Sequence, residues 1–378
     1  MYLTLQSADL GAALASATAA AGKARMVRLA ARESVAIITG NDATMSVSME
    51  VPASIEAEGE VVLNADRIAG IAGHASGDMT LSATDTSAGI TCGDGKYRLL
   101  VLSNPPAALV LDDEVASIAI TAQDLRHLLE PIAAAGREAS RYYLNGICLL
   151  SEADCLSSTA TDGVRLLRTT IAAPEFTTDR HLVIPTRSVL AIEKLTRRNT
   201  GMLTLRRNRR LVEVSGPGFT LVSKLIDVRY PDLTSVLPAA TGDAATFRRQ
   251  DLADSLARLM AAMDGEAPLL AIEWHAPGQV FLYLARQPEN SDLVDATTEG
   301  DAQIAVALAP LAMLLGEFSS AQLRLEVTNR LAIRSADKLG VVASSQWNFE
   351  PRAPSGARRT RSTGKGAGKQ KENANENV

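Results

Sequence analysis

The sequence predicts an α+β protein made of three tandem domains of similar design. Three segments share one pattern: LTLQSADLGAALASATAA at residues 3–20, IAITAQDLRHLLEPIAAA at residues 118–135 and ATFRRQDLADSLARLMAA at residues 245–262. Each opens with a short alternating stretch typical of a strand and then places an Asp-Leu pair at the same offset. The acidic residue suits the first turn of a helix, and apolar residues follow at helical spacing. A strand running into a helix therefore recurs three times.

A second strand-and-helix element recurs in the same order. Its copies start with VVLNADRIAGIA at residue 61, LVIPTRSVLAIEKL at residue 182 and QIAVALAPLAMLLGEF at residue 303. Alternating strand patterns with turn residues follow each copy. Any duplicated α+β protein would show such repeats, so they indicate architecture and not function. We predict domains at residues 1–114, 115–242 and 243–350, followed by a tail at residues 351–378.

Composition excludes several classes of protein. Hydrophobic residues make up 46% and charged residues 21%, so most of the chain should fold. No apolar run reaches the roughly 18 residues of a membrane helix, and the alanine-rich start lacks the basic region of a signal peptide. Three cysteines without a C-x-x-C pair indicate a reducing, cytoplasmic setting without structural disulfides.

Charge is distributed unevenly along the chain. The net charge is −5, but residues 351–378 hold seven Lys or Arg and two Glu, which leaves −10 on the rest. Any contact between so acidic a body and nucleic acid requires a local basic surface. The tail has no apolar period, and we expect it to be disordered. Two roles stay open for it: a solubilising end, or a basic arm that touches DNA or an acidic partner.

No motif for catalysis stands out. The chain lacks G-x-x-x-x-G-K-[ST] and H-E-x-x-H, and its four histidines stand far apart in sequence. We therefore expect no catalytic residue, no cofactor and no metal site. An enzyme built on a duplicated α+β frame stays an alternative, because residues that cluster only in the tertiary structure escape detection from sequence.

Three segments in the middle of the chain are more specific. They are RYYLNGICL at residues 141–149, TATDGVRLL at residues 159–167 and SKLIDVRYPDLTSVLP at residues 223–238. They closely resemble the bacterial DNA polymerase III beta subunit, the beta sliding clamp. The resemblance extends in weaker form over residues 1–345 and agrees with the three similar domains of that family.

The resemblance implies a DNA clamp fold and a function. Two subunits would join head to tail into a closed ring of six domains around duplex DNA. The ring would tether the replicative polymerase for processive DNA replication and would have no catalytic site of its own. The implied partners are double-stranded DNA, the DNA polymerase III alpha subunit, the clamp loader complex, other proteins with a clamp-binding motif and a second copy of the chain, with no membrane partner.

The resemblance also implies a DNA-contact surface. A sliding protein should contact phosphates, which carry no sequence information, rather than base edges. A tyrosine pair and nearby arginines fall at inward positions, and a basic residue after the first helix leaves two choices open. The candidates are Tyr142 and Tyr143, Arg137 and Arg141, and Lys23 or Arg25. Ordinary packing of the tyrosines and a solubilising role for the cations are the alternatives.

One residue is a candidate for the contact between subunits. Tyr97 lies in an alternating segment, residues 96–102, that we expect to form an edge strand. An unpaired edge favours pairing with another chain, here the third domain of a partner subunit.

A peptide pocket is the last site that the resemblance implies. An apolar hollow with a few polar groups would receive a Leu or Phe of a partner peptide. The candidates, for which ordinary core packing is the alternative, are Leu144, Thr161, Gly163, Val164, Arg165, Leu166, Pro238, Val341 and Val342.

The chain departs from the family at this pocket. Val164 stands where the family has His, and Val341-Val342 leads into ASSQWNFE rather than a Met-Pro-Met-Arg type of ending. A divergent clamp-fold scaffold that recruits repair or accessory factors is therefore an alternative to the replicative clamp.

Overall fold

A computed structural model describes most of the chain. The described residues are 1–152, 154–173, 176, 181–197, 199–233, 235–238, 243–265, 268–275 and 278–349. The chain divides into two units, Met1–Gln346 and Trp347–Val378, and every helix and strand named below belongs to the first unit. The tail at residues 351–378, for which we expect disorder, lies outside the described residues.

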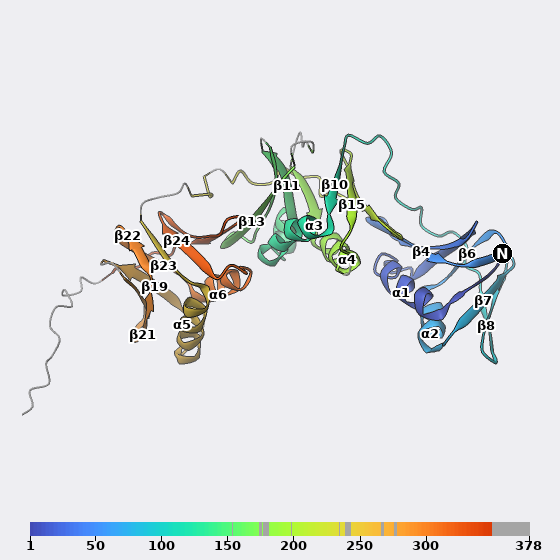
Figure 1. Cartoon of the computed structure of the whole chain (residues 1–378), viewed down its shortest axis with the longest axis horizontal. Helices are drawn as coiled ribbons and strands as arrows, with labels where there is room; N and C mark the ends of the chain where they lie inside the picture. The colour runs from blue at the N-terminus through green and yellow to red at the C-terminus, as the bar shows by residue number, and fades with distance from the viewer. Residues whose placement is uncertain are drawn as a thin grey trace, which may run out of the picture. The chain divides into compact units, whose positions relative to one another are not determined.

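A similar order of elements occurs three times in the described residues: a strand, a helix, four or five strands, a second helix and three strands. The first copy consists of β1 (Tyr2–Gln6), α1 (Ser7–Ala17), β2 (Met26–Arg32), β3 (Val35–Asn41), β4 (Met45–Pro52), β5 (Ser54–Ala57), β6 (Gly59–Asn64), α2 (Ala65–His74), β7 (Asp78–Ala83), β8 (Ser87–Cys92) and β9 (Gly95–Leu100). Its two helices lie side by side against the strands (Figure 1).

The second copy adds two short 3₁₀ helices after its first helix. It consists of β10 (Ala116–Thr121), α3 (Ala122–Leu129), η1 (Glu130–Ala134), η2 (Ala139–Leu144), β11 (Gly146–Glu152), β12 (Cys155–Thr161), β13 (Arg165–Ala172), β14 (Leu182–Pro185), α4 (Thr186–Thr196), β15 (Met202–Arg207), β16 (Leu211–Gly216) and β17 (Phe219–Lys224). Its helices α3 and α4 also contact each other.

The third copy repeats the element order of the first. It consists of β18 (Ala244–Arg248), α5 (Arg249–Ala262), β19 (Leu269–Trp274), β20 (Gln279–Leu284), β21 (Gln287–Asp295), β22 (Thr297–Glu299), β23 (Ala302–Ala307), α6 (Leu308–Gly316), β24 (Gln322–Val327), β25 (Arg330–Arg334) and β26 (Lys338–Ala343). The predicted α+β fold with three similar domains is confirmed. The boundaries near residues 114 and 242 stay predictions.

Helix starts follow the predicted acidic signal. Asp9, Asp124 and Asp251 lie in the first turns of α1, α3 and α5, where a negative charge meets the positive end of the helix dipole. At α3 the Thr121 hydroxyl accepts the N–H of Asp124 at 3.0 Å and donates to its carboxylate at 2.8 Å. This cap satisfies one of the backbone donors that a helix start leaves free.

Two sheets continue from one domain into the next. In the first, β17 pairs antiparallel with β4, and the strand order is β10-β15-β16-β17-β4-β3-β2-β6. In the second, β13 pairs antiparallel with β26, and the order is β14-β11-β12-β13-β26-β25-β24-β18-β22. The sheets β5-β1-β7-β8-β9 and β21-β20-β19-β23 belong to the first and third domains alone. Each junction thus joins the fourth strand of one domain to the last strand of the next.

Apolar cores extend across these junctions. Val47 of β4 belongs to the core cluster of the second domain, and Leu167 of β13 belongs to that of the third. Both side chains are almost fully buried. Burial of apolar area therefore stabilises each junction in addition to the backbone hydrogen bonds.

Ionic contacts reinforce the first junction. Arg187 of α4 binds Asp42 and donates to the carbonyl of Ala19 at 2.7 Å, and Lys194 donates to the carbonyl of Ala15 at 3.0 Å. Partial burial works to raise the pKa of Asp42, but hydrogen bonds from Arg187 and from neighbouring groups outweigh it and lower the pKa to about 2. Two cations of α4 thus attach the second domain to the first.

A partly buried ionic cluster reinforces the second junction. Lys338 Nζ lies 2.6 Å from the Glu130 carboxylate and donates to the carbonyl of Glu317 at 2.5 Å. His127 of α3 contacts Glu130 at 3.1 Å and Asp337 at 3.4 Å. The hydrogen bond with Glu130 raises the pKa of His127 against the opposing effect of burial. Protonated His127 therefore faces carboxylates from both domains.

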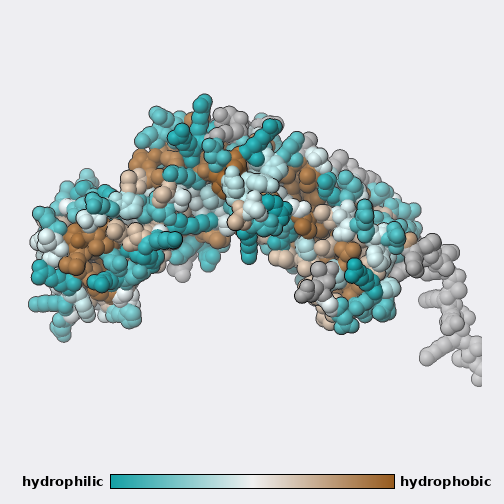
Figure 2. All heavy atoms as spheres, turned by 180° about the vertical axis from the view of Figure 1, so that it is seen from behind, coloured by the Kyte–Doolittle hydropathy of each residue, from teal (hydrophilic) through white to brown (hydrophobic). Residues whose placement is uncertain are grey.

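The surface is largely hydrophilic on the face seen in Figure 2, with apolar patches between polar side chains. None of the described helices combines the length and hydropathy needed to cross a membrane.

Two edge strands carry exposed leucines. Leu100 in β9 and Leu293 in β21 are 70% and 52% exposed. Both strands lie at a sheet edge, where exposed apolar side chains favour pairing with another chain.

We predict that the second junction weakens as the pH rises. Because the pKa of His127 is raised, its contribution to stability is fully present below the ordinary histidine pKa of about 6.5 and is lost as the pH rises through the folded-state pKa. Thermal melting from about pH 6 to about pH 8.5 should show a decrease in Tm on the order of 2 °C that His127→Gln abolishes. His181 lies outside the cluster, so the His181→Gln variant should show the same decrease in Tm as the wild type. A wild-type Tm that does not change over this range would contradict the prediction.

Candidate functional site

A cavity of about 320 Å³ opens at the second domain junction. Seven of the nine predicted pocket residues line it: Leu144, Thr161, Gly163, Val164, Arg165, Leu166 and Val341. They come from η2, from the turn between β12 and β13, and from β26. The fold thus brings together residues from two domains.

Strand alternation decides which side chains form the floor. Leu166 of β13 stands opposite Val341 of β26, so both side chains point to one face of the sheet. The neighbouring Val342 is fully buried in the core of the third domain and is not among the described lining residues. The predicted Val341-Val342 pair is split because successive side chains of a strand point to opposite faces.

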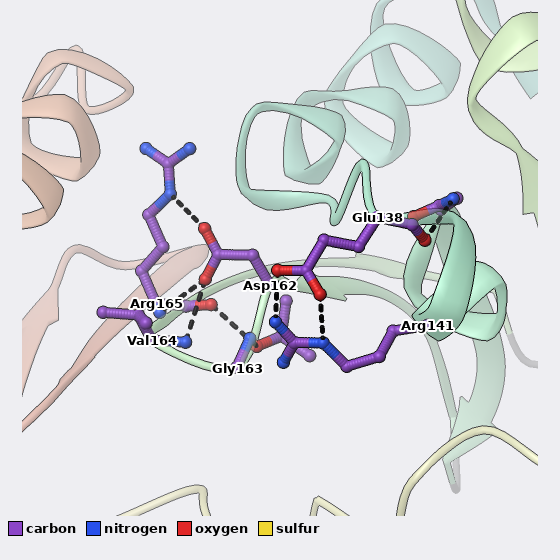
Figure 3. Close-up of polar contacts among 8 residues, drawn as sticks. Glu138, Arg141, Asp162, Gly163, Val164 and Arg165 are labelled. Carbon is purple, nitrogen blue, oxygen red and sulfur yellow. Dashed lines mark hydrogen bonds and ion pairs between the residues drawn. The ribbon is translucent and has the colours of Figure 1, made fainter.

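The turn between β12 and β13 forms one rim of the cavity (Figure 3). The Asp162 carboxylate accepts the backbone N–H groups of Val164 and Arg165 at 2.9 Å each and pairs with Arg165 Nε at 3.1 Å. Gly163 has a φ of +94°, and a Cβ added there would meet Arg141 Nη1 at 2.8 Å. The turn therefore requires glycine at this position. In this turn, 46% of the surface of Val164 is exposed to solvent.

Both arginines at this rim are paired. Arg141 donates to Glu138 from Nε at 2.9 Å and from Nη2 at 2.6 Å (Figure 3). These hydrogen bonds raise the pKa of Arg141 and lower that of Glu138. Arg165 Nε pairs with the Asp162 carboxylate at 3.1 Å. With both charges compensated locally, the cavity is suited to apolar side chains and to a few directed hydrogen bonds.

The linker between β17 and β18 forms the opposite wall of the cavity, and two arginines of β25 hold it. Arg330 lines the cavity and donates from Nη1 to the carbonyl of Ser235 at 2.8 Å. Arg334 donates from Nη2 to the carbonyl of Pro238 at 2.6 Å and from Nε to the buried Glu326 at 2.6 Å. The sequence predicted Pro238 as a lining residue, but it is not among the described residues that line the cavity. Its carbonyl instead anchors the wall through Arg334.

Sequence reasoning missed part of the lining. Ala343 was detectable, because it lies two residues beyond Val341 on the same strand face. Arg330 gave no signal, because only the fold brings the start of β25 to the second domain. The unpredicted lining residues are Pro231, Asp232, Leu233, Val236, Arg330 and Ala343, together with Arg141 and Tyr143 from the predicted DNA surface.

The basic DNA-contact candidates differ in their pairing. Lys23 and Arg137 are exposed, and neither has a side-chain partner among the residues that the structure describes. Both follow an AAAG sequence after the first helix of their domain. Arg25 has a φ of +49° and pairs with Asp66 through Nε at 3.0 Å, an interaction that raises the pKa of Arg25. The geometry therefore favours Lys23 over Arg25 as the residue open to a ligand.

The two tyrosines of η2 have different surroundings. Tyr142 is 56% exposed, and its ring meets that of Tyr143 edge to face with 6.2 Å between centroids. Tyr143 lines the cavity and packs against the cluster that contains Leu144 and Tyr230. Tyr142 is accessible to a ligand, whereas Tyr143 is largely a packing residue.

No metal cluster is evident in the described part of the chain, and one of the three thiols is deeply buried. No group of three or more His, Cys, Asp or Glu side chains there is arranged to hold a metal ion. Cys148 belongs to the apolar cluster with Leu144, Val183 and Tyr230. Burial raises the pKa of the Cys148 thiol to about 12, so this thiol stays protonated at neutral pH.

The middle of the chain matches a known family. Residues 119–232 match the family described as DNA polymerase III beta subunit, central domain. The beta sliding clamp of Pseudomonas putida is 28% identical over 207 residues, which cover 53% of this chain and 56% of that protein. The match spans little more than half the length of this relative.

Solved structures share the fold over a greater length. The DNA polymerase III subunit beta from Pseudomonas aeruginosa has a TM-score of 0.84 at 21% identity, covering 92% of this chain and 100% of that chain. The Caulobacter crescentus pol III beta has a TM-score of 0.82 at 20% identity, with coverages of 92% and 100%. At these identities the likeness shows the fold.

Fold and junction geometry together define a three-domain protein with the DNA clamp fold. The chain is similar to bacterial DNA polymerase III beta subunits in the sequence of its middle domain and in its fold, and the resemblance predicted from the middle segments is confirmed. The pocket turn and the linker wall lie inside the matched residues 119–232, or border them, whereas Arg330 and Val341 lie outside.

We predict that the two arginines of β25 that bind the linker, Arg330 and Arg334, contribute unequally to stability. Arg334→Met removes the donor to Pro238 and leaves the buried Glu326 with Arg324 as its remaining cation. The free energy of unfolding should fall by about 1–3 kcal/mol. Arg330→Met retains the apolar stem and removes only a hydrogen bond to an exposed carbonyl, so it should cost about 0.5–1.5 kcal/mol. Urea unfolding monitored by tryptophan fluorescence measures both. An equal or reversed order would contradict this account of the wall.

Proposed function

We propose that the chain is a DNA sliding clamp that encircles duplex DNA and tethers a polymerase for processive replication. The observation that carries the proposal is the repeated junction, in which the fourth strand of one domain pairs with the last strand of the next. Relatives named beta sliding clamp and DNA polymerase III subunit beta support it. The chain would act as a processivity subunit in the cytoplasm and would perform no chemistry.

The junction pattern supports a ring closed by a second copy. Pairing of β4 with β17 and of β13 with β26 leaves β21 and β9 as the equivalent strands, each at the edge of its sheet. Edge strands present unpaired N–H and C=O groups to a partner strand. Head-to-tail pairing of β21 with β9 of a second copy would reuse the junction geometry, and two such contacts would close a ring of six domains.

The side chains on these two edges are complementary. β9 exposes Lys96, Tyr97, Arg98 and Leu100, whereas β21 exposes Glu289, Leu293 and Asp295. Opposite charges across an interface steer association and fix the register, while the aromatic and aliphatic side chains supply area to bury. Tyr97, predicted from the sequence as an interface residue, lies near the middle of the β9 edge.

We expect Tyr97→Asp to raise the dimer Kd at least about ten-fold, because it places a carboxylate opposite the acidic β21 edge. Arg98→Glu should weaken the dimer as well, and Glu289→Arg in the same chain should restore part of the affinity. Met202→Asp changes another exposed large apolar residue, in β15, and serves as the matched control. Sedimentation velocity measures each variant. A wild-type chain that is a stable monomer at micromolar concentration would contradict the ring.

DNA contacts would come from flexible cations and not from groups that read bases. Lys23 and Arg137 are exposed and unpaired among the described residues, and Tyr142 lies close to Arg137 in the chain. Phosphate contacts of this kind hold the duplex without fixing the register, as sliding requires. The cavity at the second junction would receive apolar side chains of peptides from the replicative polymerase, the clamp loader and other partners.

We predict topological retention on DNA. The loaded chain should stay on circular DNA and leave linear DNA through its free ends, because the ring and not sequence-specific affinity holds it. Direct binding to short duplexes should be weak and fall steeply with salt, and Lys23→Ala with Arg137→Ala should reduce the slope of log K against log salt by about two. Equal retention on circular and linear templates would rule out a clamp.

Val164 favours a second candidate function, a clamp-fold scaffold for repair or accessory factors. An exposed aliphatic side chain stands at the rim of the cavity, where the resemblance leads one to expect a histidine. Loss of an imidazole removes a hydrogen-bonding group and changes which peptides fit. Affinities for polymerase-derived and repair-derived peptides, measured for the wild type and for Val164→His, separate the two functions.

A further inference from the structure

A second cavity lies at the first domain junction, in a place equivalent to the cavity at the second. It measures about 780 Å³ and is bordered by the linker after β9, the turn between β15 and β16, and the end of β17. The cavity of the second junction is bordered by the linker after β17, the start of β25 and the end of β26. Since β15–β17 hold the same positions in the second domain as β24–β26 in the third, part of each cavity wall comes from matching elements. The described lining of the first-junction cavity has no counterpart of η2 or of the turn between β12 and β13.

The linker wall of this second cavity is held in place by side chains. Asn41 donates to the carbonyls of Pro106 at 3.1 Å and Ala107 at 2.9 Å, and the hydroxyl of Ser46 accepts the N–H of Leu109 at 2.8 Å. Further along, Asn208 donates to the carbonyl of Asp112 at 2.9 Å. A wall that is already ordered reduces the entropy lost when a ligand binds.

The three cations of this cavity differ from Arg141 and Arg165 of the pocket, which pair with carboxylates. Arg209, Arg210 and Lys224 are exposed, and no side-chain partner for any of them occurs in the described part of the chain. Only two carboxylates, Asp113 and Asp227, are among its described lining residues. Unpaired cations on a chain of net charge −5 form a local positive surface that attracts acidic ligands.

Apolar side chains lie among these charges. Leu109, Val115, Leu211 and Leu225 line the cavity together with the cations, and Val115 is more than half exposed. A phosphate backbone gains nothing from apolar lining, and two carboxylates would repel it. A polypeptide gains from both, because its N–H groups donate to carboxylates and its side chains bury apolar area.

We propose that this cavity docks an acidic peptide segment of a partner protein, with carboxylates against Arg209, Arg210 and Lys224 and an apolar side chain against the lining. This goes beyond the proposed clamp function and gives the chain two distinct peptide sites. In the first, Arg141 and Arg165 are paired with carboxylates, whereas in the second Arg209, Arg210 and Lys224 are not. A partner that carries both kinds of segment would engage two junctions of one chain and gain affinity through its effective concentration.

The test uses the full chain and a fluorescein-labelled peptide in which two leucines are flanked by glutamates. At low ionic strength, Arg209→Glu with Arg210→Glu should weaken binding at least about ten-fold. Arg32→Glu with Arg67→Glu makes the same change in net charge elsewhere and should weaken it far less. Val164→Arg alters the pocket at the second junction and should leave this binding unchanged, so failure of the clamp proposal and failure of this one are distinguishable.

A second variant covers the case in which the double charge reversal disturbs folding. Val115→Asp adds a carboxylate at an exposed lining position and should also weaken the acidic peptide about ten-fold, while the peptide with glutamine in place of glutamate should bind weakly to every variant. The proposal would be overturned if Arg32→Glu with Arg67→Glu lost as much affinity for the acidic peptide as Arg209→Glu with Arg210→Glu. It would also be overturned if the wild type bound the glutamine peptide as tightly as the acidic peptide. Binding of a short DNA duplex that loses affinity in Arg209→Glu with Arg210→Glu, while the acidic peptide does not bind, would overturn it as well.

Discussion

Antiparallel pairing of strands across domain junctions is the interaction on which the rest of this molecule depends. At β4–β17 and β13–β26 the sheet of one domain continues into the next, so backbone hydrogen bonds and shared apolar cores hold the domains together. Ionic contacts between Arg187 and Asp42, and between Lys338 and Glu130, add specificity at each junction. The Arg187–Asp42 pair is partly exposed and contributes little stability by itself, so at that junction the strands and the core provide most of it.

Both cavities follow from this mode of joining. A linker must run from the end of one domain to the start of the next, and it passes over the line where two sheets meet. Side chains fix it there, through Asn41 and Ser46 at the first junction and through Arg330 and Arg334 at the second. The space between the linker and the strand ends becomes a concave, preformed surface of the kind that binds peptides. Because the domain is repeated, a cavity of this kind occurs at each of the two junctions, and the two cavities differ in the side chains that line them.

Charge distinguishes these surfaces from the acidic remainder. Many described arginines, including Arg25, Arg141 and Arg165, are matched by a nearby carboxylate and contribute little long-range attraction. Among the described cations without a side-chain partner are Lys23 and Arg137, after the first helices of the first two domains, and Arg209, Arg210 and Lys224, around the cavity of the first junction. On a body with negative net charge, such restricted positive areas permit contact with anionic partners without unselective coating.

The sequence by itself determined the repeat. Strand-helix segments with an Asp-Leu pair and their order were enough to predict an α+β repeat, because hydrophobic periodicity and helix-start chemistry are local properties. The clamp fold was predicted from the resemblance of the middle segments to a known family. It also predicted six of the twelve described second-domain residues that line the cavity, five of which lie on the turn between β12 and β13 or in its flanking strands. Only the tertiary structure decided that Val342 points into the core and that Pro238 stands outside the pocket. It alone brought Arg330 to the cavity wall and left Lys23 unpaired while Arg25 binds Asp66. These outcomes depend on strand register and on contacts between distant segments, and no local pattern encodes either one.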